Sequence, residues 1–197
     1  CIELCLLALF LSFPLWAKYI TDNPLIFPPE DDPLDWLQFF ATYLGAAAAL
    51  QPDNLCADMF VGYDYLYVEG YLVQNHALIL RAVELAKEAG LKVCLDLASY
   101  NIVAADRDFF THLVTEYVDI VFANEEEAHA FSGKEPAAAL EHLHSLCEVA
   151  VVKLGADGSS IMCDGKRVLV DALPVGQVVD TTAAGDTFTG YFLSALL

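Results

Sequence analysis

The chain has 197 residues, with 28 Asp and Glu against nine Lys and Arg and a formal net charge of −19. Because a nucleic-acid partner needs a basic footprint, this charge balance argues against one. The six cysteines are scattered without a Cys-x-x-Cys pair, which argues against a zinc site and a disulfide framework and indicates reduced thiols in the cytoplasm. At this length we expect one domain with a substantial core.

Residues 1–40 differ in character from the rest of the chain. Residues 1–17 are almost wholly apolar, and residues 23–33 are rich in proline and acidic side chains. The apolar run is slightly short for a membrane span and lacks the basic start of a signal peptide, so a membrane anchor is the less favoured alternative. We interpret residues 1–40 as a fragment boundary or a mis-joined coding segment, and we expect the ordered domain to occupy residues 41–197.

From residue 65 onward, segments with strand and helix patterns alternate. The helix at 75–89 has the clearest boundaries, because Asn75 is a capping residue, Gly90 follows the last turn and apolar side chains share one face. The alternation predicts an α/β fold, a doubly wound and mostly parallel sheet flanked by helices with right-handed crossovers. The expected strands are 65–69, 92–97, 118–123 and 148–154, and the expected helices are 75–89, 108–117, 125–131 and 136–147.

The last part of the chain has a different pattern. Strands are expected at 159–163 and 167–173, because they flank the hairpin signal Asp164-Gly165. Residues 178–188 then read as a short apolar strand, a turn of small residues and the start of a helix that runs to residue 197.

The turn Ala183-Ala184-Gly185 before this helix gives the strongest chemical signal. Its free backbone N–H groups and the positive end of the helix dipole favour an anion such as a phosphoryl group. Asp186 follows at a point where a carboxylate could take a proton from an attacking hydroxyl. The simpler interpretation is that Asp186 caps the helix and that the small residues only allow tight packing.

Polar residues beyond the carboxyl ends of the strands are further candidates, since such sheets bind ligands there. Simpler interpretations exist for them: a capped helix start at Asn124, an ordinary glycine turn after residue 154, a solvated lysine at a strand end, and turn-forming roles for Asp96 and Asn101. The candidates are Asp96, Asn101, Asn124, Glu127, Lys153, Gly155 and Gly158.

The stretch Asp180-Thr-Thr-Ala-Ala-Gly-Asp-Thr-Phe188 resembles the C-terminal signature of the ribokinase-like sugar and nucleoside kinases (phosphofructokinase-B type), in which Gly usually stands at the position of Ala183. Residues 68–75, 96–100 and 123–127 are most similar to adenosine-kinase-like members. The resemblance covers residues 41–197. The N-terminal Gly-Gly region, which supplies the β lid and much of the substrate pocket, has no counterpart in residues 1–40, so we expect the lid to be absent or incomplete. The family segment that follows the catalytic helix and completes the adenine pocket is cut off at Leu197, so we expect the domain to be incomplete at both ends.

The resemblance implies an ATP-dependent transfer of a phosphoryl group to a primary hydroxyl of a nucleoside or sugar, adenosine first. It makes Asp186 the base, and it places Asp96 and Asn101 as weak candidates for substrate contacts. The implied cofactors are ATP and Mg²⁺, with Mg²⁺ held through water near Asn124 and Glu127. The implied anion hole is Ala183, Ala184 and Gly185, and the implied nucleotide contacts are Lys153, Gly155, Gly158 and Asn124.

Three alternatives stay open at this point. The protein could be a sugar kinase of the ribokinase or fructokinase type, or a nucleotide-binding or dimerisation module without turnover. It could also be a membrane-anchored protein that uses residues 1–17. A homodimer is compatible with the sequence, and the substrate is unresolved because the discriminating residues lie mainly in the missing N-terminal region.

Overall fold

The structure, a computed structural model, describes residues 50–173, 176, 178, 181 and 183–196. The predictions for residues 1–40, including the expected domain boundary, lie outside the described residues. So do Asp180 and Thr182 of the C-terminal motif.

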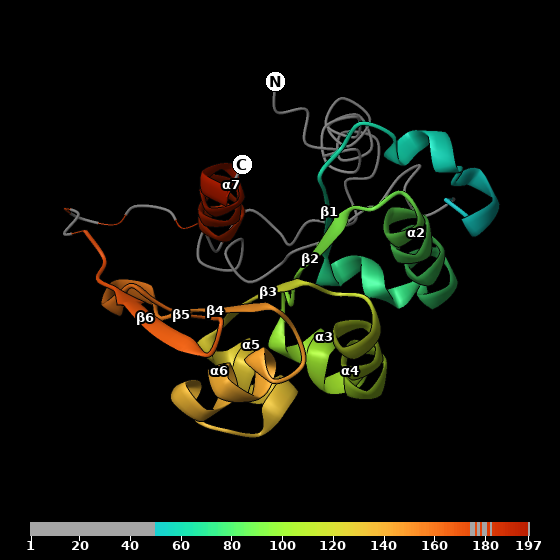
Figure 1. Ribbon diagram of the computed structural model, residues 1–197. Coiled ribbons are helices and arrows are strands. Elements are labelled where there is room, and N and C mark those ends of the chain that lie inside the picture. Colours follow the sequence, from blue (N-terminus) through green and yellow to red (C-terminus); the bar gives the residue numbers. More distant parts are fainter. Residues whose placement is uncertain (1–49, 174–175, 177, 179–180, 182, 197) are drawn as a thin grey trace, which may run out of the picture.

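A mixed sheet of six strands organises the described part of the chain, in the order β1-β2-β3-β4-β5-β6 (Figure 1). Strands β1 to β4 run parallel, and β5 and β6 continue the sheet antiparallel. Each strand begins within about two residues of its predicted start, so the predicted α/β fold with a mostly parallel sheet is confirmed. The strands are β1 (Tyr65–Glu69), β2 (Lys92–Asp96), β3 (Ile120–Asn124), β4 (Val149–Lys153), β5 (Ser159–Cys163) and β6 (Lys166–Val170).

The helices connect the strands and close the chain. The α-helices are α2 (His76–Glu88), α3 (Tyr100–Ala105), α4 (Arg107–Glu116), α5 (Glu125–Ser132), α6 (Pro136–His144) and α7 (Ala184–Leu196). Short 3₁₀ helices lie at Pro52–Asn54, Ala57–Phe60, Gly70–Gln74 and Gly155–Asp157. Among the residues that the structure describes, no helix combines the length and the apolar character needed to cross a bilayer.

Local signals explain why the helix α2 begins and ends where predicted. The Asn75 side chain accepts a hydrogen bond from the Leu78 N–H at 3.2 Å, which satisfies one of the free donors of the first turn. Gly90 follows the last turn with φ +82°, a left-handed conformation that glycine adopts without strain.

The helix α3 was missed by the sequence analysis, which expected a turn around Asn101. The segment is six residues long, too short for a helical periodicity to be recognised. Its helical form depends on tertiary packing instead, because Val103 is fully buried in the main apolar cluster and α3 packs against α5.

The helices cover the two faces of the sheet unequally. Because strand order follows chain order from β1 to β4, right-handed crossovers place α2 to α6 on one face, where they bury the larger apolar cluster. Of the helices described, α7 packs on the opposite face (Figure 1). There Phe192 meets Phe122 of β3 edge to face, with ring centroids 5.3 Å apart.

Candidate functional site

Charged side chains from neighbouring strands gather at the carboxyl edge of the sheet. Glu69 ends β1 and lies in register with Asp96, the last residue of β2. Asn124 ends β3 and lies in register with Lys153, the last residue of β4. Because these strands are parallel, their last residues meet at one edge, which is where such sheets bind ligands. The structure therefore brings together three of the candidates named from the sequence, and Glu69 joins them.

Lys153 and Asp96 form a buried ion pair at this edge. The lysine Nζ lies 2.8 Å from Oδ2 of the aspartate, and the two side chains are 19% and 6% exposed. The other oxygen of Asp96 accepts a hydrogen bond from the Ala98 N–H at 3.0 Å, in the loop that follows β2. Removing either partner of such a pair leaves an uncompensated buried charge, so each side chain holds the other in place.

Asn124 and Glu127 bind each other at the start of α5. Both Glu127 oxygens accept hydrogen bonds from Asn124, one from the backbone N–H and one from the side-chain amide, each at 2.8 Å. The Asn124 side chain in turn accepts from the Glu127 N–H at 2.8 Å. This is a capping box, the simpler of the two roles weighed from the sequence.

Glu127 nevertheless faces the charged edge. It is only 4% exposed, and burial raises the pKa of its carboxyl; the Asn124 N–H and Lys153 act in the opposite direction, while Asp96 adds to the increase. The residue thus caps α5 and contributes negative charge to the site at the same time.

Glu69 and Tyr67 form a polar pair that the sequence analysis assigned no chemistry. The Tyr67 hydroxyl donates to Oε1 of Glu69 at 2.6 Å. Burial raises the pKa of Glu69, this hydrogen bond opposes the increase, and Asp96 and Asp186 add to it. Burial also raises the pKa of Tyr67 far above its ordinary value, so its hydroxyl stays protonated and keeps donating. A signal was present in the sequence, since Glu69 ends its strand just as Asp96 ends the next one.

The first turn of α7 completes the edge. Ala183 has φ 58°, which reverses the chain, and the Ala184 N–H donates back to the Thr181 carbonyl at 3.0 Å. The first helical bond runs from the Thr187 N–H to the Ala183 carbonyl at 2.9 Å. The N–H groups of Gly185 and Asp186 precede that bond. Among the described residues no backbone carbonyl accepts from them, so they are the donors of this turn that could bind an anion.

Gly185 places this turn directly against the ion pair. A Cβ built on Gly185 would lie 3.3 Å from the Lys153 Nζ, so the helix start touches the end of β4. Asp186 follows with an exposed side chain. Burial is the main cause of the raised pKa of Glu69 and of Tyr67, and the negative charge of Asp186 adds to both.

The remaining sequence candidates occupy different positions. Gly155 and Gly158 form the turn after β4 with φ +55° and +89°, as a glycine turn predicts. A Cβ on Gly158 would lie 2.0 Å from the Val170 carbonyl oxygen, so the close packing against β6 is sufficient to require glycine at this position. A Cβ on Gly155 would meet no atom within 4 Å. Asn101 lies exposed in the first turn of α3 and not in the expected loop.

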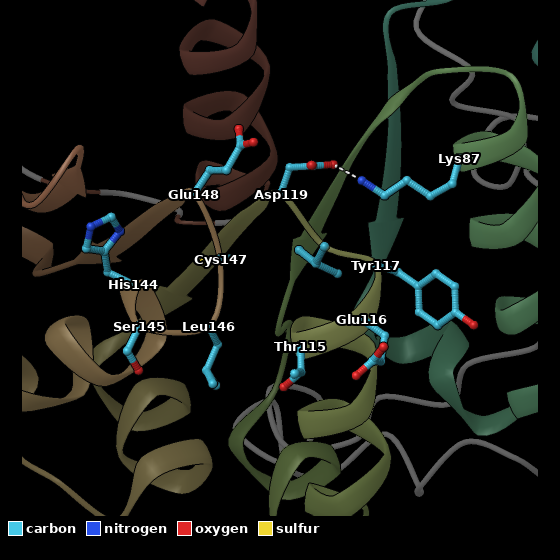
Figure 2. Close-up of a pocket in the computed structure, with 11 residues that line it drawn as sticks. Lys87, Thr115, Glu116, Tyr117, Asp119, His144, Ser145, Leu146, Cys147 and Glu148 are labelled. Atoms are coloured by element: carbon cyan, nitrogen blue, oxygen red, sulfur yellow. Dashed lines mark hydrogen bonds and ion pairs between the residues drawn. The ribbon is translucent and has the colours of Figure 1, made fainter.

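A hollow lies at the amino edge of the sheet, opposite the carboxyl edge described above (Figure 2). Its volume is about 420 Å³, and its lining includes Lys87, Tyr117, Asp119, His144 and Glu148. The Cys147 thiol in its wall is largely buried, and burial raises its pKa to about 12, so it stays protonated.

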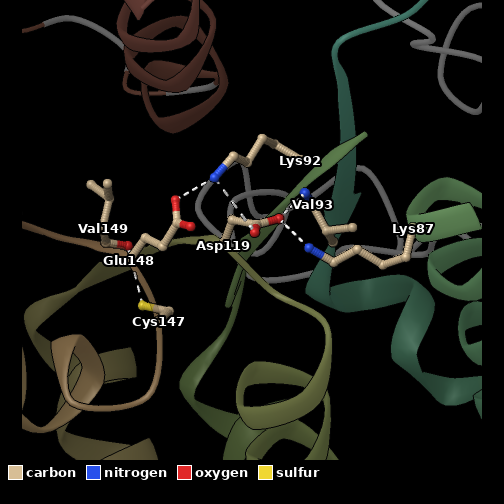
Figure 3. Close-up of polar contacts among 7 residues, drawn as sticks. All are labelled: Lys87, Lys92, Val93, Asp119, Cys147, Glu148 and Val149. Carbon is tan, nitrogen blue, oxygen red and sulfur yellow. Dashed lines mark hydrogen bonds and ion pairs between the residues drawn. The ribbon is translucent and has the colours of Figure 1, made fainter. Parts of the chain in front are cut away.

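Several charges around this hollow are paired with one another (Figure 3). Asp119 accepts hydrogen bonds from the Lys87 ammonium and from the Val93 N–H, each at 2.6 Å. Lys92 pairs with Glu148. This network ties α2, β2 and the chain before β3 and β4 together, and we assign it a structural role.

Among the described residues, no group of three or more His, Cys, Asp and Glu side chains could hold a metal ion by itself. The carboxyl edge instead offers separate carboxylates on different strands. That arrangement suits Mg²⁺, which usually keeps several waters and takes one or two carboxylates together with the phosphates of a substrate.

Comparisons with known proteins identify the family of the chain. A family model described as pfkB family carbohydrate kinase matches residues 37–197. A ribokinase of Haemophilus influenzae is 35% identical over 124 residues, which cover 59% of this chain and 38% of that protein.

Solved structures show the same fold. The crystal structure of an adenosine kinase from Sinorhizobium meliloti superposes with a TM-score of 0.72 at 36% identity, over 77% of this chain and 48% of that one. A ribokinase II of E. coli in complex with ATP and Mg²⁺ has a TM-score of 0.68 over 76% of this chain and 51% of that one; at 22% identity it shows the fold alone. The chain thus spans about half the length, or less, of these proteins.

Proposed function

We propose a phosphoryl-transfer function for this chain, which belongs to the pfkB family of carbohydrate kinases. The proposed reaction moves the γ-phosphoryl group of ATP to a primary hydroxyl of a nucleoside or sugar. The observation that carries the proposal is the contact at the carboxyl edge, where the α7 turn with the exposed Asp186 lies against the buried Lys153–Asp96 pair. Because the chain spans about half of its relatives, the activity is proposed for the protein that contains it.

Asp186 is proposed as the base that accepts the proton of the attacking hydroxyl. Its exposed carboxylate follows directly on the N–H donors of Gly185 and Asp186, so one helix turn carries both the proton acceptor and the anion donors. Phosphoryl transfer passes through a loose transition state, so orientation of the hydroxyl matters more than the strength of the base. The N–H groups and the helix dipole would stabilise negative charge on the transferred group.

ATP with Mg²⁺ is the proposed cofactor. The open backbone at Gly155 follows β4, where a nucleotide phosphate could approach the chain. Glu127 and Asn124 fit a water-mediated Mg²⁺ contact, because each Glu127 oxygen already accepts one hydrogen bond and retains a second lone pair. Bound Mg²⁺ would neutralise charge on the phosphates. The E. coli neighbour that holds ATP and Mg²⁺ supports this choice at the level of the fold.

Adenosine is the substrate we propose first, and a ribose-type or fructose-type sugar is supported equally. The neighbour from S. meliloti is an adenosine kinase, whereas the relative from H. influenzae is a ribokinase. The Glu69 carboxyl suits either class, because it lies at the same edge and can accept a hydrogen bond from a substrate hydroxyl.

We further propose a cytoplasmic location and a small-molecule partner. Among the described residues, Cys56, Cys94, Cys147 and Cys163 are free thiols, which suits a reducing compartment. A homodimer remains part of the proposal; the exposed apolar strand β6 offers a surface for it.

The test is transfer from MgATP to a panel of adenosine, ribose and fructose, together with MgATP binding by calorimetry. Transfer to adenosine or to a sugar would support the proposal and choose between its two forms. Binding of MgATP without transfer to any acceptor would favour a module without turnover. If the full-length protein that contains the chain binds no MgATP, the proposal is wrong.

A further inference from the structure

The ammonium of Lys153 lies between a buried carboxylate and the first turn of α7. Its Nζ is 2.8 Å from Oδ2 of Asp96 and 3.3 Å from the position of a Cβ on Gly185. Among the described atoms outside the turn itself, the Lys153 Nζ alone lies within 4 Å of that position. The ion pair is therefore oriented with its positive end toward the turn and its negative end away from it.

We propose that Lys153 is a positioning residue of the α7 turn, where its ammonium supplies a fixed positive charge behind Gly185 that strengthens binding of the transferred phosphoryl group. Asp96 is the partner that holds the ammonium there. This inference rests on the proposed function, in which the turn receives the γ-phosphoryl group. The sequence analysis expected Lys153 to contact the nucleotide directly, whereas in this inference its charge acts on the phosphoryl group through the turn.

The charge balance of the edge gives a reason for such a lysine. Glu69, Asp96 and Glu127 all place carboxylates at the carboxyl edge, and Asp186 adds another, so a phosphoryl group bound at this edge would meet repulsion. Lys153 is about four-fifths buried, so its charge is screened less than that of a surface lysine.

Stability alone is a weak explanation for the pair. A buried ion pair seldom stabilises a fold more than well-packed apolar side chains of similar size would, because both charges lose their water. The Ala98 N–H bond to Asp96 and the contact with Gly185 instead fix where the positive charge lies. The pair is therefore better explained by the positive charge that it holds against the α7 turn.

The experiment compares MgATP and MgADP binding to the full-length protein that contains the chain, measured by calorimetry, in Lys153→Met and in a matched control. If Lys153 acts on the turn that holds the γ-phosphoryl group, Lys153→Met should weaken MgATP binding by about 10-fold or more and MgADP binding by less than about 2-fold. Lys166→Met removes an exposed lysine from the start of β6, so both affinities should stay unchanged.

A second variant separates this effect from a loss of folding. Lys153→Met leaves Asp96 buried and unpaired, whereas Lys153→Met combined with Asp96→Asn removes both charges. The double variant should melt near the temperature of the unchanged chain and should still lose the preference for MgATP over MgADP.

The outcomes distinguish the two proposals. If the unchanged full-length protein binds neither nucleotide, the proposed function and this inference both fall. If it binds both, but the double variant keeps its preference for MgATP, only the inference is wrong. An equal loss for both nucleotides would make Lys153 an ordinary phosphate ligand and would also overturn it.

Discussion

Replacing Asp186 with Asn tests whether this residue acts as a catalytic base or only stabilises the start of α7. Asp186 is exposed in the first turn of α7, three residues after Ala183 at the N-cap position, and Asn has the same size and can still accept hydrogen bonds from the free N–H groups of that turn. The substitution removes one negative charge near a helix N-terminus, an interaction worth about 0.3–1 kcal/mol. For a chain of this size, that corresponds to a fall in melting temperature of about 1–4 °C.

The expected effect on turnover is much larger. Loss of a positioned general base lowers the rate by about 10²- to 10⁴-fold, or about 3–5 kcal/mol of barrier. The affinity for MgATP should hold or increase, because a carboxylate that repels the phosphoryl group has gone. The ratio of the kinetic effect to the stability effect therefore decides the role of Asp186.

The assay measures kcat, MgATP affinity and melting temperature of Asp186→Asn in the full-length protein. Asp108→Asn is the matched control, because Asp108 is also an exposed acid in the first turn of a helix, but in α4. The control should lose a similar amount of stability and no activity. Full activity in Asp186→Asn would refute the proposed mechanism and leave Asp186 as a cap.

Four further predictions follow from named contacts. Glu127→Gln should raise the Mg²⁺ concentration needed for half-maximal turnover, and an unchanged Mg²⁺ titration would leave Glu127 as a capping residue only. Burial raises the pKa of Glu69 above 4.5, so its contribution to stability is present below pH 4.5 and is lost as the pH rises through the raised pKa. Glu69→Gln cannot ionise, so in this variant the melting temperature should fall less between acidic and neutral pH. Leu169, 63% exposed on β6, should promote self-association, so Leu169→Lys should yield more monomer in analytical ultracentrifugation. Asp119→Ala should lower the free energy of unfolding by about 2–4 kcal/mol in a urea titration, because it leaves Lys87 and the Val93 N–H unpaired.

The sequence predicted the elements whose signals are local. The cap at Asn75, the glycine at position 90 and the hairpin turn at Asp164-Gly165 each involve residues close together in the chain, and the structure has α2, β5 and β6 where these signals placed them. The same holds for the capping box of α5, whose partners are three residues apart. In contrast, α3 was missed because its only strong stabilisation is burial against α5.

The arrangement of the site could be predicted only in part. The position of Asp96 and Lys153 at strand ends follows from the alternation of strands and helices, but their pairing joins residues that are 57 positions apart. No spacing rule in a single sequence gives such a contact. The contact of Gly185 with Lys153 depends in addition on α7 packing against the far face of the sheet, which the sequence did not indicate.

The charge of the carboxyl edge links these observations. An acidic edge in a chain of net charge −19 repels a nucleotide that approaches it, so binding there would depend on compensating charge close to the phosphates. The N–H groups of the α7 turn and the ammonium of Lys153 can offset the repulsion at the transferred group, but they lie at one point of the edge. The rest of the triphosphate would rely on Mg²⁺. We therefore expect free ATP, measured with EDTA present, to bind far more weakly than MgATP, and a similar affinity for both would show that the phosphates lie away from this edge.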